Sequence, residues 1–434
     1  MSSVASEQGV DSRSSRRVRF ASLIGTSIEF FDFYAYATAA VLVFPELFFP
    51  SHDPATATLQ SLATFALAFF ARPLGAVVFG HFGDRFGRKA TLVGSLLTMG
   101  TATVIIGLLP AYASIGVLAP VLLALCRFAQ GLGLGGEWGG AVLLATENAP
   151  RGKEVSHSMF PQLGAPIGLL ISTAVFAVLS TLGRDDFLSW GWRVPFIASA
   201  GLVLVGLYVR LRVAETAQFR RMAERNERVA QPLRVVVAEH ATALSLGTLI
   251  ASACFVIMYL MTVFALGWAT SQLGFARSRV LGAQMTGVVC MAAAIVISAR
   301  LGERLGPTSV LMITAVGLAI FGMFFGSLLD TGTYIGLVVH SVIGFTLAGL
   351  SYGPLGAALA SLFPTAVRYT GISLSFNLAG VLGASLTPYL ATSIALHHGL
   401  SSTGYYLSAI ALISLAALTS LAVNTRARAG DVVR

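Results

Sequence analysis

Charged residues are scarce in this sequence. Of its 434 residues only 11% are Asp, Glu, Lys or Arg, whereas 56% are hydrophobic. An average soluble domain has about 25% charged residues, because water must solvate its surface. The composition therefore excludes an ordinary soluble globular protein and predicts a chain that crosses a membrane several times.

Cysteine and histidine are too few and too scattered to form a disulfide framework or a metal site. The three cysteines, Cys126, Cys254 and Cys290, lie far apart within apolar segments, where packing is their expected role. No histidine pair has metal-ligand spacing. The sequence also lacks a nucleotide-binding loop, a nucleophile motif and a soluble domain large enough to signal. We therefore expect neither an enzyme nor a sensor, and neither a metal nor another cofactor.

The apolar residues gather in twelve segments, each near the roughly 20 residues that a helix needs to span a bilayer. None alternates with the short period of an outer-membrane β-barrel, so we predict helices as the spanning structure. The segments are residues 20–46, 59–82, 90–111, 116–144, 157–182, 192–211, 242–269, 281–300, 308–328, 333–359, 369–396 and 403–423.

Lysine and arginine predict the orientation of these helices. If the N-terminus is cytoplasmic, 22 of the 28 Lys and Arg residues fall in cytoplasmic segments and four in external loops. By the positive-inside rule we expect a multi-pass protein of the cell membrane with both termini in the cytoplasm. The net charge of +9 then reflects topology and does not indicate a nucleic-acid partner. The serine-rich residues 1–19 are expected to form a disordered tail, not a signal peptide.

The chain divides into two halves of six helices. Its longest charged stretch, 210-RLRVAETAQFRRMAERNERVAQPLR-234, lies midway and predicts a solvated connector. A shift of 219 residues places 301-LGERLGPT-308 over 82-FGDRFGRK-89, with glycine, acid, arginine and glycine in register. Many secondary transporters have two such halves and a binding site between them near the membrane midplane. The predicted units are a tail (1–19), an N-terminal bundle (20–211), a connector (212–241), a C-terminal bundle (242–423) and a second tail (424–434).

The turn after the second helix, 83-GDRFGRK-89, is strongly polar for its surroundings. One interpretation is a positive-inside anchor. We favour a gate, because an anchor needs neither Asp84 nor the spaced glycines, and because the pattern recurs in the second half. Asp84 would then contact the start of the eleventh helix, near residues 369–373. The gating residues predicted in this turn are Gly83, Asp84, Arg85, Gly87 and Arg88.

The same stretch resembles the signature of the major facilitator superfamily. Further strings resemble its metabolite:proton symporter family, which includes permeases for shikimate, α-ketoglutarate, citrate and proline/betaine. They are 28-IEFFDFYAYATAAVLVFPELFFP-50, 71-ARPLGAVVFGHFGDRFGRKATL-92, 127-RFAQGLGLGGEWGGAVLLATENAP-150, 161-PQLGAPIGLL-170, 190-WGWRVPF-196 and 363-FPTAVRYTG-371. The resemblance implies an all-α membrane protein of twelve transmembrane helices in two pseudo-symmetric six-helix bundles, which rock about a central cavity. It further implies a proton gradient as the energy source, and we expect a monomer.

Four charged residues fall near the middle of predicted helices, where an unpaired charge is costly. Glu29 and Asp32 are three residues apart on the first helix and share a face, while Arg72 and Arg127 lie on the second and fourth helices. One interpretation is a permanent ion-pair cluster that locks the first half together. We favour a proton-coupling site at Glu29 and Asp32, because a proton can neutralise a carboxylate but not an arginine.

Other polar residues are candidates for binding the transported molecule or for gating. We assign substrate binding to Tyr36, Arg72, Arg127, Gln130, Tyr259, Gln284, His340 and Asn377, although those of the C-terminal half also suit simple packing. Glu137 either lines the cavity or pairs with Arg85 or Arg88, and we favour the second. Glu147, Arg151 and Arg368 are further gating candidates, for which a solvated loop position is an equal alternative.

These residues predict proton-coupled uptake of a small organic acid or zwitterion by alternating access. The planar donor forks of Arg72 and Arg127 match carboxylates, which favours an organic acid. Proton-coupled export is the main alternative, because 164-GAPIG-168 resembles the glycine–proline signature of antiporters. A facilitator without proton coupling is a second alternative.

Overall fold

The computed structural model describes the backbone of residues 2–86, 88–135, 137–147, 149–150, 152–212, 232–364 and 367–432. It describes the side chains of residues 20, 22–79, 93–135, 137–143, 145–146, 149–150, 152–208, 211, 233–364 and 367–423. Most of the predicted connector, 212–241, therefore lies outside the described residues. The domain boundaries remain predictions.

The first half of the described chain is helical throughout and contains the six predicted segments. Its elements are α1 (Ser2–Leu42), α2 (Phe44–Leu47), α3 (Pro54–Phe86), α4 (Arg88–Leu108), α5 (Tyr112–Ile115), α6 (Leu118–Leu134), α7 (Glu137–Glu147), α8 (Glu154–Leu179), α9 (Arg184–Ser189), the 3-10 turn η1 (Gly191–Arg193) and α10 (Val194–Arg212). The backbone is helical from Ser2, whereas we predicted disorder for residues 1–19. The prediction relied on polar composition, which does not exclude a helix when no proline interrupts the segment.

The second half repeats this organisation with two interrupted helices. Its elements are α12 (Pro232–Glu239), α13 (Ala241–Tyr259), the π-helical η2 (Leu260–Phe264), α14 (Ala265–Ser271), α15 (Arg277–Leu305), α16 (Pro307–Leu329), α17 (Tyr334–Ser361), α18 (Arg368–Ala379), the π-helical η3 (Gly380–Ser385), α19 (Leu386–His398) and α20 (Leu400–Val432). Among the described residues, ten helical spans are long and apolar enough to cross a membrane, and Val93–Leu108 of α4 is a shorter apolar helix. The prediction of an all-α membrane protein is confirmed.

Helix ends are fixed by local sequence. The Asp53 carboxylate accepts hydrogen bonds from the backbone N–H groups of Ala55 and Thr56, both at 3.1 Å, and so caps the start of α3. Gly306, with φ of 84°, separates α15 from α16, and Gly399, with φ of 83°, separates α19 from α20. Such positive φ angles favour glycine, so these two residues allow sharp reversals between long helices.

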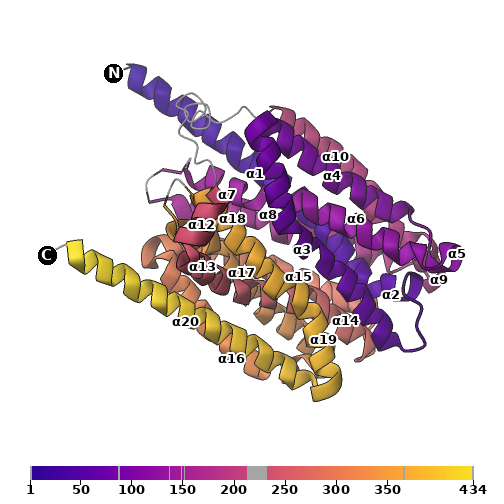
Figure 1. The fold of residues 1–434 in the computed structure, drawn as a ribbon. Helices are drawn as coiled ribbons and strands as arrows, with labels where there is room; N and C mark the ends of the chain where they lie inside the picture. The colour runs from indigo at the N-terminus through magenta and orange to yellow at the C-terminus, as the bar shows by residue number, and fades with distance from the viewer. Residues whose placement is uncertain are drawn as a thin grey trace.

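The helices of each half pack mainly on one another, and the halves meet along a few helix pairs. In the first half α1 packs along α8, and α6 lies between α3 and α4; in the second, α15 packs on α17 and α16 on α20. The halves meet where α8 contacts α15 and α17, where α3 contacts η3, and where α7 contacts α18. Both termini extend from the end of the molecule that holds α7, α12 and α18, which we call the terminal end (Figure 1).

Glycines of α6 allow that helix to lie directly on α3. A Cβ atom at Gly131 would overlap the backbone of Ala68, and one at Gly135 would overlap the carbonyl of Arg72. Small residues of this kind let helix backbones approach closely inside a membrane. The close approach puts Arg127 of α6 and Arg72 of α3 on adjacent faces, which is what a shared site requires.

Candidate functional site

Four charged side chains are buried in the first half, in the positions that the sequence singled out. The exposed fractions are 4% for Glu29, 1% for Asp32, 5% for Arg72 and 0% for Arg127. Two ion pairs elsewhere in the described residues join Lys153 to Glu303 and Arg184 to Glu46. The two interpretations of the four buried charges, an ion-pair cluster and a proton-coupling site, both stay predictions.

Arg127 and Asp32 are instead connected through two neutral side chains. Arg127 Nη1 donates to Gln130 Oε1 at 3.1 Å, and Gln130 Nε2 donates to Thr103 Oγ1 at 2.8 Å. The Thr103 hydroxyl has one hydrogen to donate, and it lies within reach of both Asp32 Oδ2, at 3.3 Å, and the carbonyl oxygen of Met99, at 3.0 Å. These contacts join α6, α4 and α1 around the two charged groups.

The second oxygen of Asp32 has its own partner. The hydroxyl of Ser199, on α10, donates to Asp32 Oδ1 at 2.5 Å. Hydrogen bonds from hydroxyl groups solvate a buried carboxylate in place of water without neutralising it. Asp32 is thus held in one orientation by hydroxyl groups of α4 and α10.

Aromatic rings cover both guanidinium groups. The central carbon of Arg127 lies 4.4 Å from the centre of the Phe33 ring, and that of Arg72 lies 5.1 Å from it. Further ring contacts are Tyr36 and Phe65 with Arg127, at 4.1 and 4.8 Å, and Phe69 with Arg72, at 5.0 Å. Cation–π contacts stabilise a buried cation without supplying negative charge. They leave guanidinium N–H groups available to an anion.

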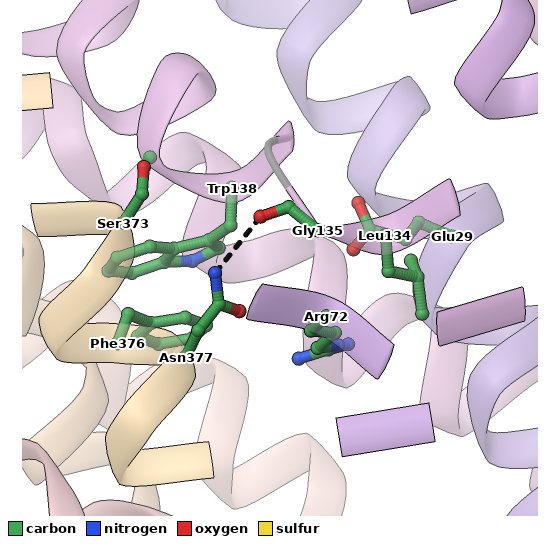
Figure 2. Close-up of a pocket in the computed structure, with 9 residues that line it drawn as sticks. Glu29, Arg72, Leu134, Gly135, Trp138, Ser373, Phe376 and Asn377 are labelled. Atoms are coloured by element: carbon green, nitrogen blue, oxygen red, sulfur yellow. Dashed lines mark hydrogen bonds between the residues drawn. The ribbon is translucent and has the colours of Figure 1, made fainter. Parts of the chain in front are cut away.

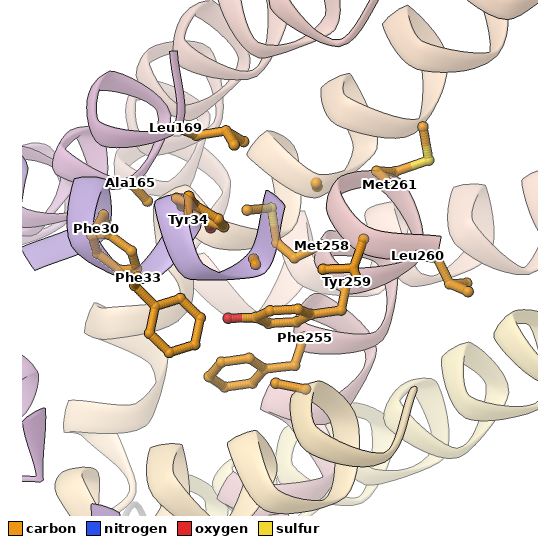
Figure 3. Packing of buried hydrophobic residues seen from close by; sticks show 14 of the residues in the cluster. Phe30, Phe33, Tyr34, Ala165, Leu169, Phe255, Met258, Tyr259, Leu260 and Met261 are labelled. Atoms are coloured by element: carbon orange, nitrogen blue, oxygen red, sulfur yellow. The ribbon is translucent and has the colours of Figure 1, made fainter. Parts of the chain in front are cut away.

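Tyr259 brings the second half of the molecule to this cluster. Its ring centre lies 6.3 Å from that of Phe33, 5.7 Å from Phe65 and 5.5 Å from Phe69. Figure 3 shows the Tyr259 ring, from α13, beside Phe33 of α1. Tyr259 is the last residue before the π-helical η2, a type of bulge that often marks functional positions. Movement of the second half therefore changes the surroundings of both arginines.

A small pocket lies between the halves next to Arg72. Glu29 and Arg72 line it from the first half, and Ser373, Phe376 and Asn377 line it from the second. Figure 2 shows Glu29 and Arg72 on one side and Asn377 on the other. The pocket has room for about one water molecule, so it is too small for a metabolite. The structure thus has Arg72 in a largely closed site.

The terminal end of this pocket is closed by side chains from α7 and α18. The Trp138 ring stacks on Phe376, with ring centres 3.5 Å apart and planes inclined by 8°. Asn377 Nδ2 donates to the carbonyl of Gly135 at 2.9 Å (Figure 2). A Cβ atom at Gly139 would overlap the side chain of Ser373, so the two helices touch here. These contacts join the two halves, and we call the cluster of Trp138, Phe376, Asn377 and Gly135 the aromatic gate.

A second contact at the terminal end involves the repeated polar motif. Glu303 Oε1 accepts a hydrogen bond from the backbone N–H of Ser156 at 3.2 Å, and Glu303 Oε2 lies 3.4 Å from Lys153 Nζ. Ser156 is in the first turn of α8, where backbone N–H groups lack partners within the helix. Glu303 therefore caps a helix of the other half.

The opposite end of the molecule carries contacts of a different kind. Arg184 Nη2 lies 2.9 Å from Glu46 Oε2 in an exposed ion pair within the first half. The guanidinium of Arg277, at the start of α15, lies over the ring of Phe187 of α9, 5.0 Å from its centre. The contact between Arg277 and Phe187 joins the two halves at this end.

Several predicted residues have other partners. Gln284 donates to the carbonyls of Met261 and Thr262, at 2.9 and 3.0 Å, and so satisfies groups that the π-helical η2 leaves free. His340 is buried beside Phe321 and Phe325 of α16 and does not line the pocket. Arg368 Nε donates to the carbonyl of Phe363 at 3.1 Å and stabilises its own turn. The structure brings none of these three to the arginines.

The remaining gating candidates have less structural description. Glu137 is half-buried at the start of α7. For Gly83, Asp84, Arg85, Arg88 and Glu147 only the backbone is described, and Gly87 and Arg151 lie outside the described residues entirely. The predicted contacts of Asp84 with the eleventh helix, and of Glu137 with Arg85 or Arg88, therefore stay predictions.

Sequence reasoning missed most of the neutral partners at the site. Thr103 and Ser199 are single hydroxyl groups in long apolar segments, and such residues are common in membrane helices. Trp138 and Phe376 carried no signal of their own, although 134-LGGEWGG-140 places an aromatic residue among glycines. That pattern of small residues around one large ring is typical of a close helix contact, and it could have indicated the gate.

Comparison with known proteins agrees with this architecture. The profile of the Major Facilitator Superfamily matches residues 22–388. The chain is 52% identical to the inner membrane metabolite transport protein YhjE of Escherichia coli, over 93% of each chain. It is 36% identical to the shikimate transporter of Escherichia coli, over 95% of each chain. It is 30% identical to the proline/betaine transporter of Salmonella typhimurium, over 94% of this chain and 83% of the other.

A solved structure shares the fold. The xylose transporter XylE from Escherichia coli, in a partially occluded inward-open conformation, superimposes with a TM-score of 0.72. The match covers 93% of this chain and 96% of the other, at 16% sequence identity. The resemblance to the metabolite:proton symporters and the prediction that the protein is not an enzyme are both confirmed. The chain belongs to the major facilitator superfamily and is a multi-pass metabolite transporter of the cytoplasmic membrane.

Proposed function

We propose that this transporter couples the uptake of a small organic acid or zwitterionic metabolite to the inward movement of a proton. The observation that supports this best is the chain of hydrogen bonds from Arg127 through Gln130 and Thr103 to Asp32. It links a cation suited to an anionic substrate with a carboxylate suited to a proton. Relatives that are named as shikimate and proline/betaine transporters agree with a substrate of this size.

The coupling follows from the two protonation states of Asp32. As a carboxylate, Asp32 accepts hydrogen bonds from Ser199 and from Thr103, whose single hydroxyl hydrogen the carbonyl of Met99 also attracts. A proton on Asp32 removes the negative charge and weakens these charge-assisted bonds. Gln130 and Arg127 are then free to reorient toward a bound anion. The proton gradient supplies the energy for this cycle, and no cofactor takes part.

Alternating access would use the two ends of the molecule in turn. We place the terminal end in the cytoplasm, as the distribution of lysine and arginine predicts. The aromatic gate and the Glu303 cap hold this end closed. Release of these contacts would open the terminal end, and release of the contact between Arg277 and Phe187 would open the other end. If the two ends open in turn, Arg72 is exposed to each side of the membrane alternately.

An exporter is the second candidate function. Gly164 and Gly168 of α8 pack so closely on α1 that a Cβ atom at either would overlap Thr26 or the backbone near Phe31. These residues belong to the stretch that resembles the antiporter signature. The close contact between α1, which carries Asp32, and the glycine-rich α8 is compatible with the exchange of a proton for a substrate as well as with symport.

Transport in liposomes distinguishes these functions. The protein is reconstituted, a pH difference is imposed, and uptake of radiolabelled shikimate and proline is followed with and without a protonophore. Symport requires accumulation that depends on an inward proton gradient and stops with the protonophore. Accumulation driven by an outward proton gradient would identify an antiporter, and equal rates under all gradients would identify a facilitator.

A further inference from the structure

The seventh membrane helix contains a π-helical bulge. It runs as α13 to Tyr259, then as η2 and then as α14, and Figure 3 shows Tyr259, Leu260 and Met261 where it changes. The backbone N–H of Leu260 donates to the carbonyl of Val256, four residues back, whereas that of Ala265 donates to Leu260, five residues back. Such a bulge adds one residue to a turn of the helix. It therefore rotates α14 relative to α13 by the angle of one residue, roughly 100°.

Gln284 of the neighbouring α15 supports this bulge. Its side chain is 3% exposed, and Nε2 donates to the carbonyls of Met261 and Thr262, at 2.9 and 3.0 Å. Both donors of the amide are thus used by η2. Buried carbonyl groups that lose their donors are costly, whereas a continuous α-helix supplies donors from its own backbone. Without the Gln284 amide, the α-helical form of this segment is therefore favoured.

The rotation of α14 determines how the two halves meet at the end opposite the terminal end. Val41, next to the last residue of α1, belongs to the first half, and Gly267 of α14 belongs to the second. A Cβ atom at Gly267 would lie 3.1 Å from Val41 Cγ1, which is closer than side-chain atoms usually pack. A glycine is thus needed where α14 touches α1. This contact joins the halves at the same end as that between Arg277 and Phe187.

Loss of the bulge would replace that glycine. In a continuous α-helix each place after η2 would be taken by the preceding residue, so Leu266 would face Val41 in place of Gly267. The leucine side chain does not fit at a position where even a Cβ atom is crowded. The two helices would then have to move apart.

The other part of the helix is held too firmly to rotate instead. Most of α13 is buried, and a Cβ atom at Gly383 of η3 would lie 2.8 Å from Phe255 Cβ. We propose that Gln284 is a positioning residue of the transport cycle. It keeps the bulge of the seventh helix in place, so that Gly267 meets Val41 and the halves can close at the end opposite the terminal end.

Disulfide crosslinking between α1 and α14 tests the proposal. In a full-length parent whose three cysteines are changed to alanine, one variant carries Val41→Cys with Gly267→Cys and another carries Val41→Cys with Leu266→Cys. A disulfide requires Cβ atoms about 3.5–4.5 Å apart, so in the parent the pair at 41 and 267 should form the more readily. Gln284→Met retains a long unbranched side chain but removes both donors. We expect the order to reverse, with the pair at 41 and 266 forming in place of the other.

Two further variants separate this role from general support of the fold. Gln272→Met makes the same substitution at an exposed position directly after α14 and should keep the order of the parent. Deletion of Val263 shortens η2 by one residue, so a continuous α-helix would again bring Gly267 to Val41. Combined with Gln284→Met, this deletion should restore the pair at 41 and 267.

The crosslinking order in Gln284→Met decides the outcome by itself. If the order of the parent is retained, the bulge does not depend on the amide and the proposal is wrong. If neither pair forms, the amide only supports the fold, and the proposal is again wrong. A deletion variant with the melting temperature of the parent and no recovery of the first pair would also contradict it. The experiment uses neither a substrate nor a proton gradient, so failure of the proposed symport would leave this inference unchanged.

Discussion

Glu303 accepts a hydrogen bond from the backbone N–H of Ser156, 3.2 Å away, and so joins the eighth membrane helix to the start of the fifth. The internal repeat aligns Glu303 with Asp84, which follows the second helix. For Asp84 we predicted a contact with the start of the eleventh helix. The two contacts are the same relationship with the halves exchanged, since the second and eighth helices correspond, as do the eleventh and fifth.

Replacing Glu303 should therefore loosen the terminal end. Glu303→Gln keeps the shape of the side chain but removes its charge, and a hydrogen bond to a charged group contributes about 1.5–3 kcal/mol. We expect the equilibrium to shift toward the conformation that is open at the terminal end by about tenfold. Distances between spin labels on the two halves at this end measure the shift. Glu154→Gln is the control, because Glu154 is also in the first turn of α8, and its hydrogen bond within the described residues is to the backbone N–H of nearby Gly152. An identical distance distribution in both variants would argue against the cap.

Asp84→Asn should have a similar effect by the symmetry of the repeat. The first turn of α18 begins at Arg368 and offers backbone N–H groups to a carboxylate from the other half. We expect slower turnover, nearly unchanged membrane insertion, and less crosslinking between cysteine pairs placed across the terminal end. Lys89→Gln should do much less, because it retains the acid and the glycines of the turn. Altered topology in Lys89→Gln, with no effect of Asp84→Asn, would identify the turn as an anchor.

Sequence patterns predicted the parts of this protein that the membrane constrains directly. Apolar length gave the helix positions, and the cost of burying charge singled out Glu29, Asp32, Arg72 and Arg127. The hydrogen-bond partners of these charged groups could not be predicted from the sequence. Thr103 and Ser199 are short neutral side chains, and only the packing of the helices brings them to Asp32. Gln284 was misleading for a related reason. Its amide is used by carbonyls of a π-helical segment, and no sequence signal that we recognised marks that segment.

Thr103→Val should separate substrate binding from proton coupling. Valine preserves the shape but removes the hydroxyl that links Gln130 to Asp32, so Gln130 Nε2 loses its partner. A buried donor left without a partner costs about 1–3 kcal/mol, and a lower melting temperature is expected. Accumulation driven by the pH difference should fall more than the equilibrium binding affinity does. Thr98→Val is the control on the same helix, because the hydrogen bond of the Thr98 hydroxyl in the described part of the chain is to the carbonyl of Gly94 in the preceding turn. Equal loss of binding and accumulation would mean that the hydroxyl only supports the fold.

Arg127→Lys and Arg72→Lys should both weaken substrate binding although they keep the positive charge. An ammonium group lacks the planar fork that binds a carboxylate through two donors, and it stacks less well on the Phe33 ring. We expect a dissociation constant raised by at least about tenfold, equivalent to roughly 1.5–3 kcal/mol. Arg279→Lys should bind as the parent does. If both buried variants also bind as the parent does, the arginines are structural and the assignment of an organic anion loses its main support.

Trp138→Ala tests whether the aromatic gate holds the terminal end closed. The substitution removes a ring that stacks on Phe376 at 3.5 Å and that donates from Nε1 to Gln162 Oε1 at 3.1 Å. Truncation of an aromatic side chain in a protein core lowers the free energy of unfolding by about 3–5 kcal/mol. Because Trp138 packs between the halves, its truncation should weaken the contact between them. The closed conformation should be destabilised more than the open one, so a cysteine placed at Ser373 should react faster with a water-soluble maleimide. Phe325→Ala is the matched control, because it removes a buried ring within the second half, where it packs on His340. Faster labelling in both variants would indicate general loosening of the fold, whereas faster labelling in Trp138→Ala alone would assign the closure to the stacked pair.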